Sequence, residues 1–435
     1  MDMMQIYQSI FWYMFLFYLA GFVSYTLYFM SKKERLNKIG LSLFSIGFAL
    51  QTTAFVIKWT IVGAIRFQNM FEHISLMSWA GVAIMIYVIF RYKNAVVGVI
   101  IAPIIVMLNA AAALLDKNPA ENLMPALQSN WLTIHISLAA IGSGAFVVAG
   151  AVSLLYLFKN HKYSPKNKTQ RNDFFQQSLI FLVFIPVGLF FVLRILGLMP
   201  EHTAFQFGVY ETQSAFQNAR TILGQFVITM GILFVPMLFV FGYVYSNKKQ
   251  NRESNGYGGV MFAIYILSLI IGALILGSLS YSGTLIITPI RHAGGFWRFF
   301  EFVGAAHVIA IAIFIVLYFV IYELVGERIN RLAGNLDLFD EINYRAVSLG
   351  YPLYTVGALF AGAIWAEQAW GTFWGWDPKE VGALLVWLFY SAVLHARYNK
   401  DWRGSKLAIL SIIGTIMIFL TFYGNYFFGG LHAYA

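Results

Sequence analysis

The chain has 435 residues, of which 60 % are hydrophobic and only 11 % are charged. Soluble domains average about 45–50 % apolar and about 25 % charged residues, so soluble cores do not account for this composition. It excludes a soluble globular protein, a disordered chain and a secreted disulfide scaffold, and it indicates a polytopic membrane protein. The chain has no cysteine, which excludes disulfides, thiolate metal sites and cysteine nucleophiles.

Apolar segments long enough to cross a bilayer recur along the whole chain. A transmembrane helix needs roughly 20 predominantly apolar residues. We therefore expect an all-α fold, a polytopic membrane helical bundle of about twelve transmembrane helices. The expected spans lie near residues 10–30, 39–57, 73–90, 94–115, 130–157, 175–196, 221–245, 257–285, 304–325, 346–366, 380–396 and 405–424.

Basic residues are distributed unevenly between alternate loops of this arrangement. Most of the 29 lysines and arginines fall in one set of loops, such as those after the first and fifth spans. By the positive-inside rule these loops face the cytoplasm, which places both termini and the segment 367–379 on the extracytoplasmic side. The net charge of +10 is then a topology signal, and we do not expect nucleic-acid binding.

The segment 365–380 departs from the apolar background and concentrates aromatic and charged groups. Tryptophan is enriched at membrane interfaces, so an aromatic belt is one interpretation. The density of tryptophan and the interleaved glycines instead favour a flat, rigid platform for a large planar ligand, flanked by charge. The residues of this predicted platform are Trp365, Trp370, Trp374, Trp376, Asp377 and Lys379.

Three of the eight histidines have suggestive positions. His135 and His432 fall on the same predicted side as the tryptophan segment, and His395 lies near the cytoplasmic end of the eleventh span. For a single membrane histidine, packing or hydrogen bonding is at least as common a role as ligation. Two imidazoles facing an aromatic platform are, however, the arrangement that axial ligation of haem iron requires.

The tryptophan segment resembles a known motif. The run Trp370-Gly-Thr-Phe-Trp374-Gly-Trp376-Asp377-Pro378-Lys379-Glu380 is similar to the WWD motif of haem-handling proteins. Its Pro-Lys-Glu ending resembles the CcsA/ResC branch, the integral-membrane subunit of System II cytochrome c synthases. The resemblance is strong over 344–435 and weaker over 72–157.

The resemblance implies a role for each matching residue. His135 and His432 match the two outer histidines that ligate haem iron, and His395 matches a transmembrane ligand nearer the cytoplasm. The haem-holding motif is matched by Trp370, Trp374, Trp376 and Asp377. We further expect Lys379 to meet a haem propionate.

The resemblance also implies a function in cytochrome c-type biogenesis. Heme b would cross the cytoplasmic (inner) membrane to the outer site, where a cytochrome c synthase (haem lyase) reaction joins it to an apocytochrome c CxxCH segment. The expected partners are a CcsB/ResB-type membrane protein, the apocytochrome and a thiol-reducing thioredoxin-like protein. Three alternatives stay open: a haem transporter without ligation chemistry, a b-type redox subunit, and a structural assembly subunit.

The expected organisation has three regions. Residues 1–157 form an N-terminal transmembrane region with the outer ligand His135, and residues 346–435 form the WWD region with the outer tail. Residues 158–345 hold transmembrane helices that shorter relatives lack, at about 175–326. His292 and His307 in this region allow either an accessory haem site or ordinary local packing.

Overall fold

The computed structural model describes residues 3–63, 67, 69–113, 128–160, 205–207, 262–272, 285–287, 295–321, 326–331, 334–398 and 402–428. The chain divides into two compact units. Unit 1 comprises Met1–Tyr156, Leu332–Phe422 and Gly430–Ala435, and unit 2 comprises Leu157–Arg331 and Tyr423–Gly429. The tryptophan segment, His135 and His395 all belong to unit 1.

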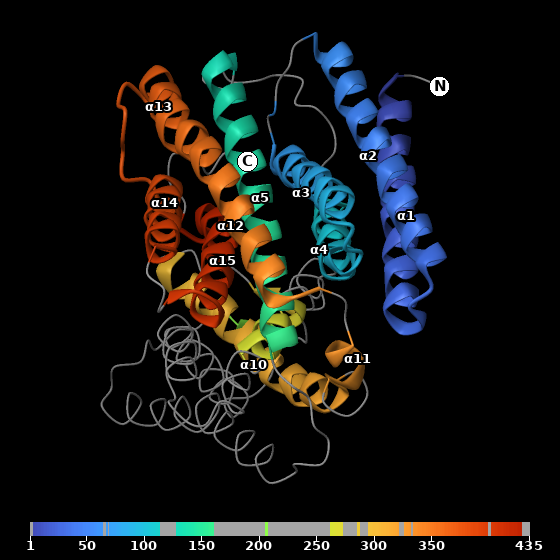
Figure 1. Ribbon diagram of the computed structural model, residues 1–435. Helices are drawn as coiled ribbons and strands as arrows, with labels where there is room; N and C mark the ends of the chain where they lie inside the picture. Colours follow the sequence, from blue (N-terminus) through green and yellow to red (C-terminus); the bar gives the residue numbers. More distant parts are fainter. Residues whose placement is uncertain are drawn as a thin grey trace, which may run out of the picture. The chain divides into compact units, whose positions relative to one another are not determined.

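Unit 1 is a bundle of long apolar helices (Figure 1). Seven spans in the described part of the chain are long and apolar enough to cross a membrane, and α12, η4 and α13 form one of them. The helices are α1 (Met3–Ser31), α2 (Glu34–Val62), α3 (Met70–Tyr92), α4 (Val96–Ala113), α5 (Asn130–Asn160), α12 (Leu336–Tyr354), η4 (Thr355–Ala361), α13 (Gly362–Trp370), α14 (Pro378–Ala396) and α15 (Ser405–Phe428).

These spans confirm the prediction of a helical membrane bundle, and the chain is an integral membrane protein. Hydropathy predicts them well because a lipid-embedded backbone must satisfy its own hydrogen bonds, which a helix does. The expected spans at 175–196 and 221–245 lie outside the described residues. The total of twelve spans and the sidedness of the termini therefore stay predictions.

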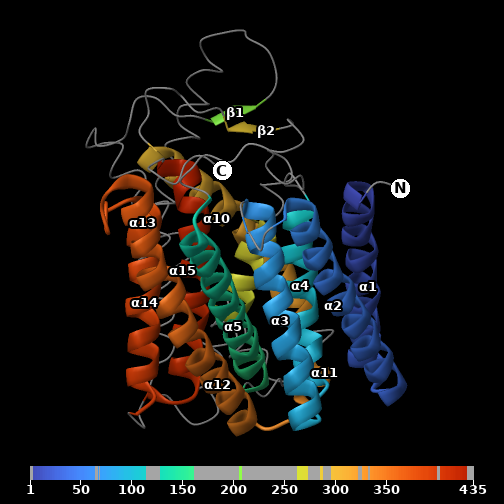
Figure 2. The same cartoon turned by 90° about the horizontal axis from the view of Figure 1, so that it is seen from above.

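Helix α5 lies between α3 and the α12–α13 helix (Figure 2). Gly142 is so close to α12 that an added Cβ would lie 2.9 Å from the carbonyl oxygen of Gly350. Gly144 is similarly close to α3, where a Cβ would lie 2.6 Å from the carbonyl oxygen of Met77. Small residues allow helix backbones in membranes to approach closely, and here they bring three helices together.

A π-helix, η4, interrupts the long span between α12 and α13. Pro352, three residues before it, has no N–H to donate and disturbs the regular ladder. Within η4, Gly357 packs directly on α5, because an added Cβ would lie 2.5 Å from the backbone nitrogen of Ala139. Single π-helical turns are frequent at functional sites, and this one faces the helix that carries His135.

Buried polar groups tie the N-terminal helices together. Lys58 of α2 and Glu72 of α3 form an ion pair of 2.8 Å, with both side chains 2 % exposed. About two turns before Lys58 on α2, the Gln51 amide accepts a hydrogen bond from the Tyr18 hydroxyl and donates one to the carbonyl of Ser75. Ionisable groups within membrane spans are paired in this way because an isolated charge is costly there.

The described parts of unit 2 are α10 (Gly295–Phe319), α11 (Gly326–Asn330), a helix over Phe262–Gly272 and a short ribbon. In the ribbon, β1 (Phe205–Phe207) pairs antiparallel with β2 (Leu285–Ile287). The all-α prediction did not include these strands, because periodicity does not distinguish short apolar strands from helix. His307 is fully buried, and its Nδ1 lies 2.5 Å from the Tyr265 hydroxyl, whereas His292 lies outside the described residues. The choice between an accessory haem site and local packing stays a prediction.

Candidate functional site

The tryptophan loop is fixed at both ends by helix caps. Gly371 ends α13 in the left-handed conformation, at φ 73°, which glycine adopts without steric cost. Asp377 is the N-cap of α14 and forms a capping box with Glu380, while Pro378 occupies the first helical position. The loop between these caps lies at what we call the motif end of unit 1, where α13 ends and α14 begins.

The aspartate of the motif has a structural role that the sequence analysis missed. Asp377 is 4 % exposed, and its side chain accepts a hydrogen bond of 2.9 Å from the backbone N–H of Lys379. The Glu380 carboxylate accepts from the backbone N–H groups of Asp377 and Gly375, at 3.2 and 2.7 Å. The pattern Asp-Pro-x-Glu, which is typical of a helix start, was the available signal.

Replacing Asp377 tests this capping role. We expect Asp377→Ala to lower the free energy of unfolding by about 1 kcal/mol, because the N-cap hydrogen bond is lost. Asp377→Asn keeps an oxygen acceptor and is the matched control, with a melting temperature close to that of the parent. Thermal unfolding of the detergent-purified protein measures both variants, and an Ala variant as stable as the parent would refute the cap.

Trp376 is presented outward in a strained conformation. Its side chain is 72 % exposed, and its φ of 56° lies in the left-handed region, which costs a non-glycine residue about 1–2 kcal/mol. The capping box immediately after it holds this conformation in place. Its ring meets that of Trp374 edge to face, at 6.0 Å and 86°. Strain of this kind persists where the surrounding structure imposes it, often at functional sites.

Of the other two tryptophans, Trp365 is buried and stacks beside His135, whereas Trp370 is partly exposed and contacts Trp365. Trp365 is 1 % exposed and meets Trp370 edge to face, with ring centroids 4.8 Å apart. Its ring also lies almost parallel to the His135 imidazole, at 5.8 Å and 13°. Because both tryptophan pairs are edge to face, the four indoles do not form one flat surface. The Trp365 ring packs against the His135 imidazole, whereas the Trp376 ring is exposed.

The His135 imidazole is held by a backbone carbonyl of the π-helix. Its Nδ1 lies 2.9 Å from the oxygen of Gly357. A carbonyl oxygen only accepts hydrogen bonds, so Nδ1 must carry the proton. In neutral imidazole this places the lone pair on Nε2, and a carbonyl partner of this kind is typical of metal-ligating histidines.

Glycine at position 362 makes room for this imidazole. An added Cβ would lie 2.9 Å from Nδ1 of His135. We expect Gly362→Ala to displace the ring. Under the ligand role that the resemblance implies for His135, haem retention then falls about tenfold or more, as it does when the groups that orient a metal-ligating histidine are changed. The control is Gly40→Ala, whose Cβ would lie 3.0 Å from the Tyr25 ring, remote from the site. Equal haem contents in the two purified variants would contradict this account.

His73 also lies at the motif end, in the first turn of α3. His73 is partly buried, and Lys379, in the first turn of α14, and His135 lie near enough to add a smaller electrostatic influence to the effect of burial. The packing agrees with this, because α3 and α5 touch at Met77, about one turn after His73, and at Gly144, about two and a half turns after His135. The sequence analysis did not place His73 at the site, although it begins a span on the same predicted side as His135.

His395 lies elsewhere in unit 1. It is exposed near the end of α14, on the same face as Leu385 and Leu388, which are each 48 % exposed. One turn before it, Ser391 hydrogen-bonds Tyr351 of α12 at 2.6 Å, whereas His135 contacts η4 and α13. His135 and His395 therefore lie at different heights along the α12–α13 span and do not belong to one site. His432 lies outside the described residues.

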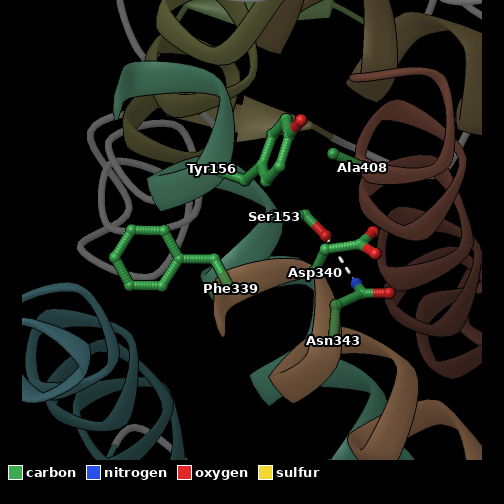
Figure 3. A pocket seen from close by; sticks show the side chains of 6 residues that line it. All are labelled: Ser153, Tyr156, Phe339, Asp340, Asn343 and Ala408. Atoms are coloured by element: carbon green, nitrogen blue, oxygen red, sulfur yellow. Dashed lines mark hydrogen bonds between the residues drawn. The ribbon is translucent and has the colours of Figure 1, made fainter. Parts of the chain in front are cut away.

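A small polar hollow lies between α5, α12 and α15 (Figure 3). Asn343 donates hydrogen bonds to the Ser153 hydroxyl at 2.6 Å and to the carbonyl of Ala149 at 3.1 Å. The hollow is too small to hold a water molecule, so it is a packing feature. Its lining residues are Ser153, Tyr156, Phe339, Asp340, Asn343 and Ala408.

Comparison with known proteins gives the family. The sequence profile described as "Cytochrome C assembly protein" matches residues 67–432, which is most of the chain. The matched region includes the tryptophan loop, His135 and His395. The chain belongs to the cytochrome c assembly protein family. This confirms the resemblance to CcsA and supports a role in cytochrome c biogenesis.

Curated relatives agree with this assignment. The chain is 26 % identical over 388 residues to "Cytochrome c biogenesis protein CcsA" of Crocosphaera subtropica, covering 87 % of this chain and 82 % of the relative. It is 24 % identical over 403 residues to the protein of the same name from Nostoc, covering 92 % and 89 %. A 117-residue stretch is 44 % identical to the CcsA protein of Pyropia yezoensis, covering 26 % and 36 %.

Proposed function

We propose that this assembly protein binds heme b at the motif end of unit 1 and presents it for covalent attachment to apocytochrome c. The observation that carries the proposal is the hydrogen bond from His135 Nδ1 to the carbonyl of Gly357. It fixes the tautomer that offers Nε2 to iron, and it fixes the ring orientation as well. Haem is the substrate in this account.

The groups around His135 suit a planar, anionic ligand. Trp376 offers an exposed ring face for the macrocycle, held out by its strained backbone. Lys379 supplies a cation for a propionate, and the imidazole of His73 is a second hydrogen-bond donor in the same region. Trp365 and Trp370 keep the imidazole side apolar and rigid. By family resemblance, His432 is the second axial ligand.

The chemistry needs no nucleophile from this chain, which has no cysteine. The two thiols come from the CxxCH segment of the apocytochrome, whose histidine takes over one axial position. Each thiol adds across a vinyl group: sulfur bonds to one vinyl carbon, and the thiol hydrogen goes to the other. The protein contributes orientation, because holding two reactants together in a fixed geometry lowers the barrier to a reaction between them. We expect a thioredoxin-like protein to keep the thiols reduced.

His395 fits an inner haem site shared with a partner. It projects from an exposed apolar face of α14, and a polar side chain facing lipid from within a span is unfavourable. We propose that a helix of a CcsB/ResB-type partner covers this face and supplies the second ligand. Haem then passes from the cytoplasmic side to the motif end, which the positive-inside rule places outside the cytoplasmic membrane.

The test is production of a c-type cytochrome in a host that lacks its own maturation system. The chain is co-expressed with its CcsB/ResB-type partner and a secreted CxxCH reporter, and covalent haem is stained after denaturing electrophoresis. We expect stained reporter only when the chain is present, and none with a reporter whose two cysteines are serine. Haem-loaded complex without stained reporter would favour the alternative, a transporter without ligation chemistry. A folded complex without haem would refute both.

A further inference from the structure

At the end of α14, the side chain of Arg397 contacts several residues of α12. Arg397 forms an ion pair with Asp340, and its second nitrogen lies 3.7 Å from the Glu341 carboxylate. The guanidinium also lies over the Tyr344 ring, 5.0 Å from its centroid. These three partners occupy one and a half turns of α12, so the arginine contacts that helix at several points.

The ion pair between Arg397 and Asp340 is more buried than an ordinary surface ion pair. The side chains of Arg397 and Asp340 are 16 % and 18 % exposed. The neighbouring pair between Arg345 and Glu341 is 61 % and 37 % exposed. A sheltered guanidinium–carboxylate pair depends strongly on geometry, because its planar donors match the carboxylate in few orientations.

Arg397 and His395 point in nearly opposite directions. Two positions along an α-helix correspond to a rotation of about 200°. Arg397 faces α12, whereas His395 lies on the exposed face of α14 with Leu388. Any rotation of the last turns of α14 about its axis therefore moves both side chains together. Holding the arginine fixes the direction in which the imidazole faces.

The middle of α14 is held to the same long span by other contacts. Ser391 meets the Tyr351 hydroxyl at 2.6 Å, and the Trp387 indole N–H donates to Thr355 at 3.0 Å. Both contacts precede His395 in the helix. Arg397 follows it, so the histidine lies between two attachment points on one rigid neighbour.

We propose that Arg397 is a positioning residue for His395. Its contacts with Asp340, Glu341 and Tyr344 set the rotation of α14, so that the imidazole stays on the exposed side of that helix, beside Leu388, and is accessible to the helix that brings the second haem ligand. The inference rests on the proposed role of His395 in haem binding. Arg397 acts through the histidine and does not itself touch haem.

The first arm of the test measures helix rotation without haem. Because the chain has no cysteine, Leu349→Cys on α12 and Tyr398→Cys, the residue after Arg397, provide two unique spin-label sites, both exposed. Distances are measured by pulsed EPR on the full chain in lipid nanodiscs. We expect Arg397→Gln to shift or broaden the distance distribution by about 5 Å, the helix radius. Arg345→Gln, which removes a cation that pairs with Glu341, is the matched control and leaves the distribution unchanged.

The second arm measures haem in the complex with the partner. The His395-dependent haem is the fraction lost in His395→Ala, and we expect Arg397→Gln to lose at least half of it, with loss of the low-spin bis-imidazole EPR signal. The swap of Asp340→Arg with Arg397→Asp restores the pair and is expected to restore both readouts, which separates positioning from misfolding.

An unchanged distance distribution in Arg397→Gln overturns the proposal, and so does unchanged His395-dependent haem despite a rotated helix. If His395→Ala loses no haem at all, the inner site itself is absent and the proposed function fails at that point. The distance measurement then still reports whether Arg397 sets the rotation. The two failures are therefore distinguishable.

Discussion

Replacing His135 by alanine is expected to abolish cytochrome c maturation, lowering the yield of covalent haem on a CxxCH reporter about 100-fold or more. The variant removes the imidazole but leaves the Gly357 carbonyl, the Trp365 ring and the glycine at 362 that surround it. These walls form a cavity of imidazole shape. Imidazole added to the medium is therefore expected to restore a measurable part of the yield.

The matched control for this prediction is His161→Ala, which removes a histidine from a predicted cytoplasmic loop. We expect its yield to equal that of the parent, with or without imidazole. A normal yield from His135→Ala would contradict axial ligation by this residue. Loss of the protein from the membrane would point to misfolding, which is why protein abundance is measured in the same samples.

Replacing Trp376 by glycine is expected to change stability and function in opposite directions. Glycine tolerates the left-handed backbone at φ 56°, so the free energy of unfolding should rise by about 1 kcal/mol. The exposed ring is lost, so haem retention should fall about tenfold, the value of one aromatic contact at the upper end of its range. Thermal unfolding and the haem-to-protein ratio are measured on the same purified samples.

Two variants control this experiment. Trp376→Phe keeps an aromatic ring and the strained backbone, so we expect intermediate haem retention and unchanged stability. Trp12→Ala removes another exposed tryptophan, 49 % exposed on α1, and should leave haem retention unchanged. If Trp376→Gly is less stable than the parent and still retains haem, the strained backbone at position 376 does not serve to present an aromatic ring to the ligand.

Local sequence signals predicted the frame of the motif end well. Hydropathy located the helices, and glycine and proline marked where α13 ends and α14 begins, at Gly371 and Pro378. The capping box of Asp377 was equally readable, because it depends on residues three apart. The sequence analysis instead treated that carboxylate as a charge beside the ligand.

Contacts between distant parts of the chain were not predictable from one sequence. His135 and Gly357 are 222 residues apart, and their hydrogen bond depends on a π-helix that no residue pattern announces. The tryptophan spacing suggested a flat platform, whereas backbone geometry buries Trp365 and exposes Trp376. The pairing of Arg397 with Asp340 was not predictable either, because it requires the packing of α12 on α14.

The most direct test of the central claim is the absorption spectrum, with a pyridine haemochrome assay, of the chain purified in detergent with its CcsB/ResB-type partner. We predict non-covalent, low-spin b-type haem at a stoichiometric level, lost from the motif end in His135→Ala and retained in His161→Ala. A folded complex that carries no haem, or one that carries the same haem in His135→Ala, would contradict the proposal that His135 presents haem beside the tryptophan loop.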